Sequence, residues 1–149
     1  MRIVLDTNIL ARATPGKSGP AAAGREAIRP PHLLVLSSHL LTELAEVLRY
    51  ERMRRLHGLS EREIDHFVDA LRANALNVEV ELPGDSAIVP NDPDDDPIVA
   101  TAVVGRAEYL CSLDRHLFRP EVHAHCTPHG IRVVTDVELL ALLRSRQNP

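Results

Sequence analysis

Hydrophobic and polar positions follow one another along the chain in blocks that predict strands alternating with helices. Four short apolar runs have the length of strands, and they span residues 2–6, 33–36, 109–113 and 131–134. The run at 33–36 is continuously apolar, as in a strand that is buried on both faces. Residues 77–82 alternate between polar and apolar side chains and predict one more strand.

Apolar residues at helical spacing fill most of the intervals between these runs. They predict helices over residues 21–29, 97–105 and 136–146, one that begins after Ser37 or Ser38, and one that begins after Ser60. Ser60 and Glu63 fit a capping box at the start of that last helix. Since strands and helices alternate, we expect an α/β fold with a mainly parallel sheet.

Length and composition indicate one ordinary globular domain. The chain has 149 residues, of which 44% are hydrophobic and 26% are charged, and we expect a single domain over residues 1–146 with a short tail at 147–149. The two cysteines give no disulfide framework, which favours the cytoplasm. No apolar run approaches the roughly 20 residues of a membrane span, so no membrane association is expected. The net charge of −4 argues against a strongly basic nucleic-acid coat, although local basic patches and bound cations remain compatible with a nuclease.

Four acidic residues stand where predicted strands give way to loops or helices: Asp6, Glu43, Asp96 and Asp114. In an open parallel sheet such junctions open onto one edge, which is where ligands bind. Several carboxylates brought together there repel one another unless cations are present. The pattern therefore predicts a site for Mg²⁺ or Mn²⁺, which prefer oxygen ligands.

Three of these acids also have an ordinary structural explanation. Asp6 and Asp96 are suited to capping a helix, and Asp114 is suited to a turn after a strand. Asp95, which precedes Asp96, is the alternative candidate for the ligand role at this point of the chain. Each signal is weak alone, and the joint placement at one predicted edge is what favours the metal site.

Helix geometry separates Glu43 from its neighbour Glu46. With about 100° of rotation per residue, the centre of the apolar stripe falls near Leu44. Glu43 lies at the edge of that stripe, where a carboxylate can reach a cleft, whereas Glu46 turns further toward solvent. An ordinary surface position remains the alternative for Glu43.

The basic residues are sixteen arginines and one lysine, Lys17. Phosphatase or receiver chemistry at a strand-end aspartate usually needs a lysine late in the chain, and none occurs here. A basic tract at the end of the Glu43 helix offers phosphate contacts through Arg49, Arg52 and Arg55, with a solvated helix end as the alternative. With only 3% aromatic residues, recognition of RNA shape and backbone is favoured over extensive base stacking.

Histidines gather near the end of the chain together with one cysteine. His123, His125, Cys126 and His129 resemble zinc ligands, but their order does not fit the standard spacings. We expect a polar surface loop there. Cys111 lies in a predicted core strand and is expected to pack there rather than to act as a nucleophile.

Four stretches of the chain resemble the PIN-domain family, the metal-dependent ribonuclease fold of bacterial toxin–antitoxin pairs of the VapBC type. They are VLDTNIL at 4–10, SHLLTEL at 38–44, DPDDDPIVATA at 92–102 and SLDRHL at 112–117, and the resemblance covers nearly the whole length. The first and third stretches, in this order and spacing, are the more specific. The resemblance implies a single PIN-like domain with a five-stranded parallel sheet and helices on both faces.

The resemblance also implies an activity and its residues. It makes the four acids named above the catalytic residues and the ligands of Mg²⁺ or Mn²⁺, with Thr7 and Asn8 supporting Asp6. It implies a homodimer and a cognate antitoxin protein as partner. At the position two after Asp114, such proteins often carry another Asp, and this chain has His116. That departure bears on whether a second metal ion binds.

Three hypotheses about function follow. The first is a metal-dependent endoribonuclease that acts on RNA as the toxin of a toxin–antitoxin pair. The second is a PIN-like module that binds RNA or a protein without cleaving. The third is a different metal-dependent phosphoesterase, such as a structure-specific DNA nuclease. Loss of metal-dependent RNA cleavage on substitution of Asp6 distinguishes the first from the second, and parallel RNA and DNA substrates distinguish the first from the third.

Overall fold

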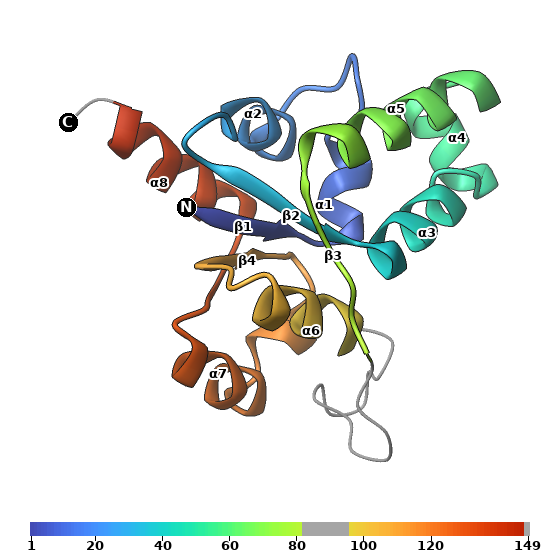
Figure 1. Ribbon diagram of the computed structural model, residues 1–149. Coiled ribbons are helices and arrows are strands. Elements are labelled where there is room, and N and C mark those ends of the chain that lie inside the picture. The colour runs from blue at the N-terminus through green and yellow to red at the C-terminus, as the bar shows by residue number, and fades with distance from the viewer. Residues whose placement is uncertain (82–95, 148–149) are drawn as a thin grey trace.

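The protein is described by a computed structural model that covers residues 1–81 and 96–147 (Figure 1). Its elements in chain order are β1 (Arg2–Leu5), α1 (Thr7–Arg12), α2 (Pro20–Ala27), β2 (Leu33–Ser37), α3 (Ser38–Val47), α4 (Glu51–His57), α5 (Glu61–Asn74), β3 (Leu76–Val78), α6 (Asp96–Val104), β4 (Tyr109–Cys111), the 3-10 helix η2 (Arg115–Phe118), α7 (Pro120–Cys126), the 3-10 helix η3 (Thr127–His129), β5 (Arg132–Val134) and α8 (Asp136–Gln147).

A five-stranded parallel sheet forms the centre of the domain, with strand order β3-β2-β1-β4-β5. The chain moves outward from β1 through β2 to β3, and it then returns to the other side of β1 to form β4 and β5. The switch point of the topology therefore lies between β1 and β4. Figure 1 shows α6 and α7 on one side of the sheet and α1, α2, α3, α5 and α8 on the other. The predicted α/β fold is confirmed.

The central strands are the most deeply buried part of the core. Ile3 and Val4 of β1, Val35 of β2 and Leu110 of β4 are fully buried, as expected for parallel strands covered on both faces. Gly105, which follows α6, packs so closely on β2 that an added Cβ would lie 2.4 Å from Cγ1 of Val35. Only glycine allows this approach without displacing the strand.

Helix α1 directly follows the first strand and is a helix that the sequence pattern did not predict. It begins at Thr7, immediately after Asp6, and buries Ile9 and Leu10 against the core, close to α3. Six residues are too few to show a helical period in the sequence, and the apolar pair Ile9-Leu10 fits several local structures. The helix forms because these side chains find a buried surface, which is a tertiary effect.

The basic tract 49–57 does not continue the helix of Glu43, contrary to the expectation. Helix α3 ends at Val47, the amides of Arg49 and Tyr50 bond to carbonyls three residues earlier, and α4 is a separate helix. His57 at its end is buried, and its ring bonds to the Leu48 carbonyl at 2.7 Å and to the Leu59 amide at 2.9 Å. This ring therefore connects the two ends of the α3–α4 corner.

Two further segments differ from the sequence-based prediction. Strand β3 ends at Val78, which pairs with Ser37, because β2 becomes α3 at the next residue and offers no further partner. The predicted end of that strand at residue 82 lies outside the described residues. The segment around His123, which was expected to be a polar loop, is instead helical and consists of η2, α7 and η3. Val122 and Cys126 of α7 are completely buried.

Candidate functional site

Asp6 and Asp114 come from the ends of the two strands that flank the switch point, β1 and β4. Ser112, which is fully buried, donates its hydroxyl hydrogen to Oδ2 of Asp6 at 2.6 Å. The same hydroxyl oxygen accepts the backbone N–H of Asp114 at 2.9 Å. One serine therefore fixes the Asp6 carboxylate against the loop that carries Asp114.

Asp6 is a buried carboxyl group, 6% exposed. Burial raises its pKa above the ordinary value of 3.8, the hydrogen bond from Ser112 opposes this, and the negative charge of Asp114 raises the pKa again. Asp6 occupies the N-cap position of α1, yet its side chain makes no capping hydrogen bond. The backbone N–H groups of Thr7 and Asn8, at the start of α1, nevertheless lower the pKa of the Asp6 carboxyl group, so the helix terminus also stabilises its charged form.

Thr7 connects α1 to α3 through Glu43. Its hydroxyl group donates to Oε2 of Glu43 at 3.0 Å, and Thr7 itself is buried directly after Asp6. The side-chain hydroxyl of Thr7 therefore supports Glu43, while the backbone N–H groups of Thr7 and Asn8 act on Asp6 and lower the pKa of its carboxyl group. Asn8 is exposed on the first turn of α1. Glu46 lies elsewhere on α3, at a shallow hollow that Arg49 also lines.

Asp96 is the first residue of α6 and is 6% exposed. The helix is held near the carboxyl end of β2 by Thr101, whose hydroxyl donates to the Pro97 carbonyl at 2.6 Å and is hydrogen-bonded to the hydroxyl of the buried Ser37 at 2.8 Å. Ser37 also accepts the amide of Leu40 at the start of α3. This pair of hydroxyl groups joins β2, α3 and α6 on the same edge of the sheet. Asp95 lies outside the described residues.

Asp114 caps the 3-10 helix η2 by accepting the backbone N–H of His116 at 2.9 Å. The imidazole Nδ1 of His116 lies 3.8 Å from the same carboxylate oxygen. Both side chains are about a quarter exposed, at 27% for Asp114 and 26% for His116. The histidine therefore stands beside the last acid of the set.

The donor set of the four acids consists of carboxylate oxygens, which suits a hard divalent cation. Within residues 1–81 and 96–147, no three histidine, cysteine or acidic side chains are arranged as they would be around a metal ion. What the described part shows directly is the Asp6–Ser112–Asp114 connection and the Thr7–Glu43 hydrogen bond. The ligand assignment stays a prediction.

The basic tract is largely engaged in ion pairs. Arg49 pairs with Glu61 at 2.9 Å and Asp65 at 2.6 Å, Arg54 pairs with Glu61, and Arg55 pairs with Glu51. Arg52 is exposed, and no ion pair connects it to any other described residue. Contact of Arg49, Arg52 and Arg55 with RNA stays a prediction.

The histidines near the end of the chain are spread over α7 and η3. His123 and His129 are exposed, and the rings of His125 and His129 are 5.8 Å apart between centroids. Cys126 is fully buried, and burial raises the pKa of its thiol. Its sulfur therefore faces the core, as in an ordinary packing residue.

The polar hydroxyl groups of the site were not singled out from the sequence. Ser112, Ser37 and Thr101 each lie within or beside an apolar run, where a serine or threonine is too common to indicate a function. Their full burial gives them meaning, because a buried hydroxyl group needs a partner, and here the partners lie at the acidic edge. Ser112, two positions before an acid at the end of a strand, is the nearest to a recognisable signal.

Comparison with known proteins places the chain in a family. The family model of the PIN domain matches residues 2–116, which is more than half of the chain. A search of curated proteins found no match. None of the described helices is long and apolar enough to span a membrane. The matched range includes β1 to β4 and all four acidic residues, and the chain therefore belongs to the PIN domain family.

Proposed function

We propose that this chain is an Mg²⁺- or Mn²⁺-dependent endoribonuclease that hydrolyses RNA phosphodiester bonds, as the toxin of a toxin–antitoxin pair. PIN domains are typically nucleases and generally use divalent metal ions. The observation that carries the proposal is the connection of Asp6 to Asp114 through Ser112 at the switch point of the sheet. In open α/β sheets this is where ligands bind.

The chain's own residues have separate tasks in this proposal. Asp6, Glu43, Asp96 and Asp114 would hold one or two divalent cations. Such a cation would supply Lewis-acid stabilisation of the phosphoryl oxygens and of the leaving group. Ser112 keeps Asp6 in one orientation, and Thr7 does the same for Glu43. Because carboxylates that are held together repel one another, the site is destabilised without cations, and a bound metal ion would relieve this repulsion.

The toxin role includes a partner. An edge that carries several carboxylates is complementary to an arginine side chain, which pairs with a carboxylate through two hydrogen bonds. We therefore propose that a cognate antitoxin occupies the acidic edge and blocks it. A homodimer and action in the cytoplasm complete this proposal, and both rest on the resemblance to toxins of the family.

Cleavage of RNA by the purified protein tests the activity. Labelled single-stranded RNA and DNA of the same sequence are incubated with the protein and Mg²⁺ or Mn²⁺, and with EDTA as a control. We expect cleavage of RNA in the presence of metal, no cleavage with EDTA, and at least about a hundredfold loss in Asp6→Asn. Equal activity of Asp6→Asn and wild type would exclude the proposed site.

The same assay separates the rival functions. RNA that is bound but left intact under every metal condition would favour the binding module. Cleavage of DNA alone would favour a DNA nuclease. Growth tests the toxin role: expression in the native host should slow growth, and co-expression of a small protein encoded beside the gene should restore it. Normal growth without any such partner would argue against a toxin.

A further inference from the structure

Two segments of the chain are rich in basic side chains, and they differ in how their charges are balanced. On α4 and just before it, three of the four arginines meet acids of α4 and α5, as in the pairs of Arg49 with Asp65 and of Arg55 with Glu51, and only Arg52 has no ion pair with a described residue. Such pairs keep the positive charge close to a compensating negative charge. A polyanion gains less from arginines that are already paired than from those that are not.

The second segment runs from η2 to the start of β5. Residues 115–132 contain three arginines and four histidines against a single acid, Glu121, although the whole chain has a net charge of −4. Arg115 is exposed and Arg119 is half-buried. Among the residues that the structure describes, neither has a carboxylate partner. Their charge is therefore available to a ligand.

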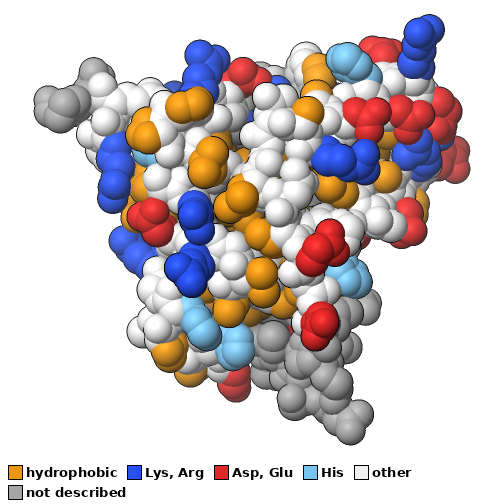
Figure 2. Space-filling model, viewed as in Figure 1, with side chains coloured by type: hydrophobic (Ala, Val, Ile, Leu, Met, Phe, Trp, Pro, Cys, Tyr) orange, Lys and Arg blue, Asp and Glu red, His pale blue; other side chains and the backbone are white. Residues whose placement is uncertain are grey.

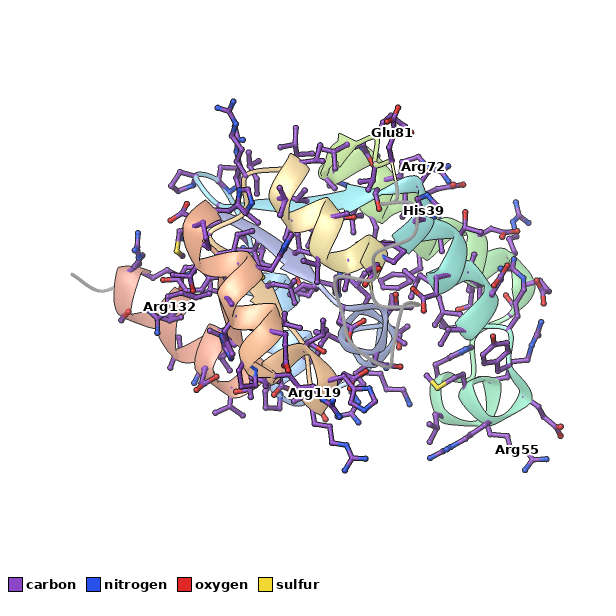
Figure 3. All side chains as sticks on the ribbon, turned by 90° about the horizontal axis from the view of Figure 1, so that it is seen from below. His39, Arg55, Arg72, Glu81, Arg119 and Arg132 are labelled. Carbon is purple, nitrogen blue, oxygen red and sulfur yellow. The ribbon has the colours of Figure 1, made fainter. Side chains whose placement is uncertain are left out.

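The position of Arg115 and Arg119 is set by the acid that precedes them. Asp114 caps η2 through the amide of His116, so Arg115 is the first residue of that 3-10 helix and Arg119 directly follows its end. Both come after the carboxyl end of β4. Arg132 begins β5, at the opposite end of the sheet, where its guanidinium lies over the Tyr109 ring at 5.8 Å. Figure 3 shows Arg119 and Arg132 well apart, and Arg119 on a different part of the molecule from Arg55.

A second feature of the same segment is suited to a nucleic acid. The ring of His123, exposed on the first turns of α7, stands edge-on to Phe118 with 6.5 Å between ring centroids. A flat ring beside positive charges offers a stacking surface to an unpaired base. Figure 2 shows histidine side chains together on the lower part of the molecule, where α7 lies in Figure 1.

We propose that Arg115 and Arg119 form the surface that binds the phosphate backbone of single-stranded RNA and guides it to the acidic edge, with His123 as a stacking contact. This rests on the proposed function, since it assumes that RNA is the substrate. An acidic edge repels a polyanion, so binding needs positive charge close to the acids but outside their ligand positions. Arg115 begins the 3-10 helix that Asp114 caps, and Arg119 directly follows the end of that helix, so both lie on the element that is attached to the last acid.

The test is RNA binding by full-length protein that cannot cleave. In the Asp6→Asn background, the Kd for a fluorescent single-stranded RNA is measured by anisotropy over a range of salt concentrations. The variant Arg115→Ala/Arg119→Ala is compared with Arg132→Ala and with Arg52→Ala/Arg55→Ala. We expect about a tenfold or larger loss of affinity for the first and less than about a twofold loss for Arg132→Ala. The slope of the logarithm of the association constant against the logarithm of the salt concentration should become shallower by about 1.4, since two phosphate contacts with a single strand are removed.

In the alanine variants, either of two results would overturn the proposal. One is a loss in Arg115→Ala/Arg119→Ala no greater than that in Arg132→Ala. The other is a larger loss, and a larger change of slope, in the pair on α4. Arg115→Lys/Arg119→Lys serves as the check on folding, since backbone contact needs the charge and this variant should keep affinity within about threefold. A lysine variant as weak as the alanine variant would indicate a structural role and would also overturn the proposal.

Failure of the proposed function gives a different pattern. If wild-type protein does not cleave RNA with metal, the nuclease proposal fails, while loss of RNA binding in Arg115→Ala/Arg119→Ala still supports the binding surface. If wild-type protein cleaves and this variant cleaves equally well at every salt concentration, the surface proposal fails and the nuclease proposal stands.

Discussion

The two ends of the parallel sheet use polar residues in different ways. At the carboxyl ends of β1 and β4, Asp6 and Ser112 are buried and bond to each other at 2.6 Å. At the amino ends of the same strands, Arg2 donates from its backbone to the Glu108 carboxylate at 3.3 Å and from its side chain to the Gly105 carbonyl at 3.2 Å. Glu108 is half exposed.

The difference separates polar groups that serve a site from those that close the fold. Exposed polar contacts at the amino end cost little desolvation and contribute little stability. The buried carboxylate at the carboxyl end is costly, since burial and the charge of Asp114 both raise its pKa. Hydrogen bonds from Ser112 and from the backbone of Thr7 and Asn8 oppose this rise in the pKa, and under the proposed function a bound cation would offset the remaining cost.

The largest expected effect concerns two glutamates of α3, of which only Glu43 is connected to the carboxyl end of β1, through Thr7. Glu43 accepts a hydrogen bond from Thr7, whereas Glu46 lies near Arg49. Glu43→Gln should lower kcat/KM for RNA by about a hundredfold, because it removes a charge that the site needs for metal binding. Glu46→Gln, its matched control, should change it by less than about threefold. Equal losses in the two variants would remove Glu43 from the site.

The second prediction concerns the stability cost of Asp6. Its pKa is raised in the folded protein, so the folded state favours the protonated group. The resulting stability is present below the unfolded-state pKa, near 3.8, and is lost as pH rises through the higher folded-state pKa. In EDTA at pH 7, Asp6→Asn should therefore raise the free energy of unfolding, by on the order of 1 kcal/mol.

Urea unfolding between pH 7 and pH 4 checks this prediction. The advantage of Asp6→Asn over wild type should shrink as pH falls, because wild type becomes protonated. Glu46→Gln replaces an exposed acid away from the acidic edge and is the control, with no comparable gain expected. A less stable Asp6→Asn at pH 7 would show that the carboxylate contributes to the fold.

A smaller effect is expected at His116, which stands 3.8 Å from the Asp114 carboxylate. Imidazole suits Mn²⁺ better than Mg²⁺, and a histidine in place of the usual aspartate removes one negative charge. Wild type should therefore be a few times more active with Mn²⁺ than with Mg²⁺, and His116→Asp should narrow that ratio. Cleavage rates of wild type and His116→Asp, measured with each metal at saturating concentration, test this prediction. The same ratio in both proteins would mean that His116 does not take part in metal selection.

The smallest effect is expected at the amino end of the sheet. Arg2→Ala removes the partly buried side-chain hydrogen bond to the Gly105 carbonyl, so the free energy of unfolding should fall by about 0.5–1 kcal/mol. Cleavage of RNA should stay within about twofold of wild type. A loss of activity without a loss of stability would show that the two ends of the sheet are coupled. It would contradict the view that the polar contacts at the amino end contribute only to the fold.

Local sequence patterns predicted most of the helices and strands. They failed for elements whose formation depends on contacts with distant segments of the chain. Strands such as 33–36 and the capping box at Ser60 and Glu63 were predictable, because burial on two faces and reciprocal capping leave a pattern in neighbouring residues. Helix α1 and the short strand β3 were not. The first depends on the surface that receives Ile9, and the second depends on where β2 ends.

The sequence by itself determined that acidic residues follow strands and that the chain is α/β, since both are properties of local order. Only the tertiary structure decided which strand ends meet. Asp6 and Ser112 are 106 positions apart, and they touch because β4 returns to pair with β1 in the strand order β3-β2-β1-β4-β5. It also decided which arginines are balanced by acids, because Arg49 finds Asp65 on another helix. Contacts of this kind depend on packing between distant segments, and no local pattern of residues records them.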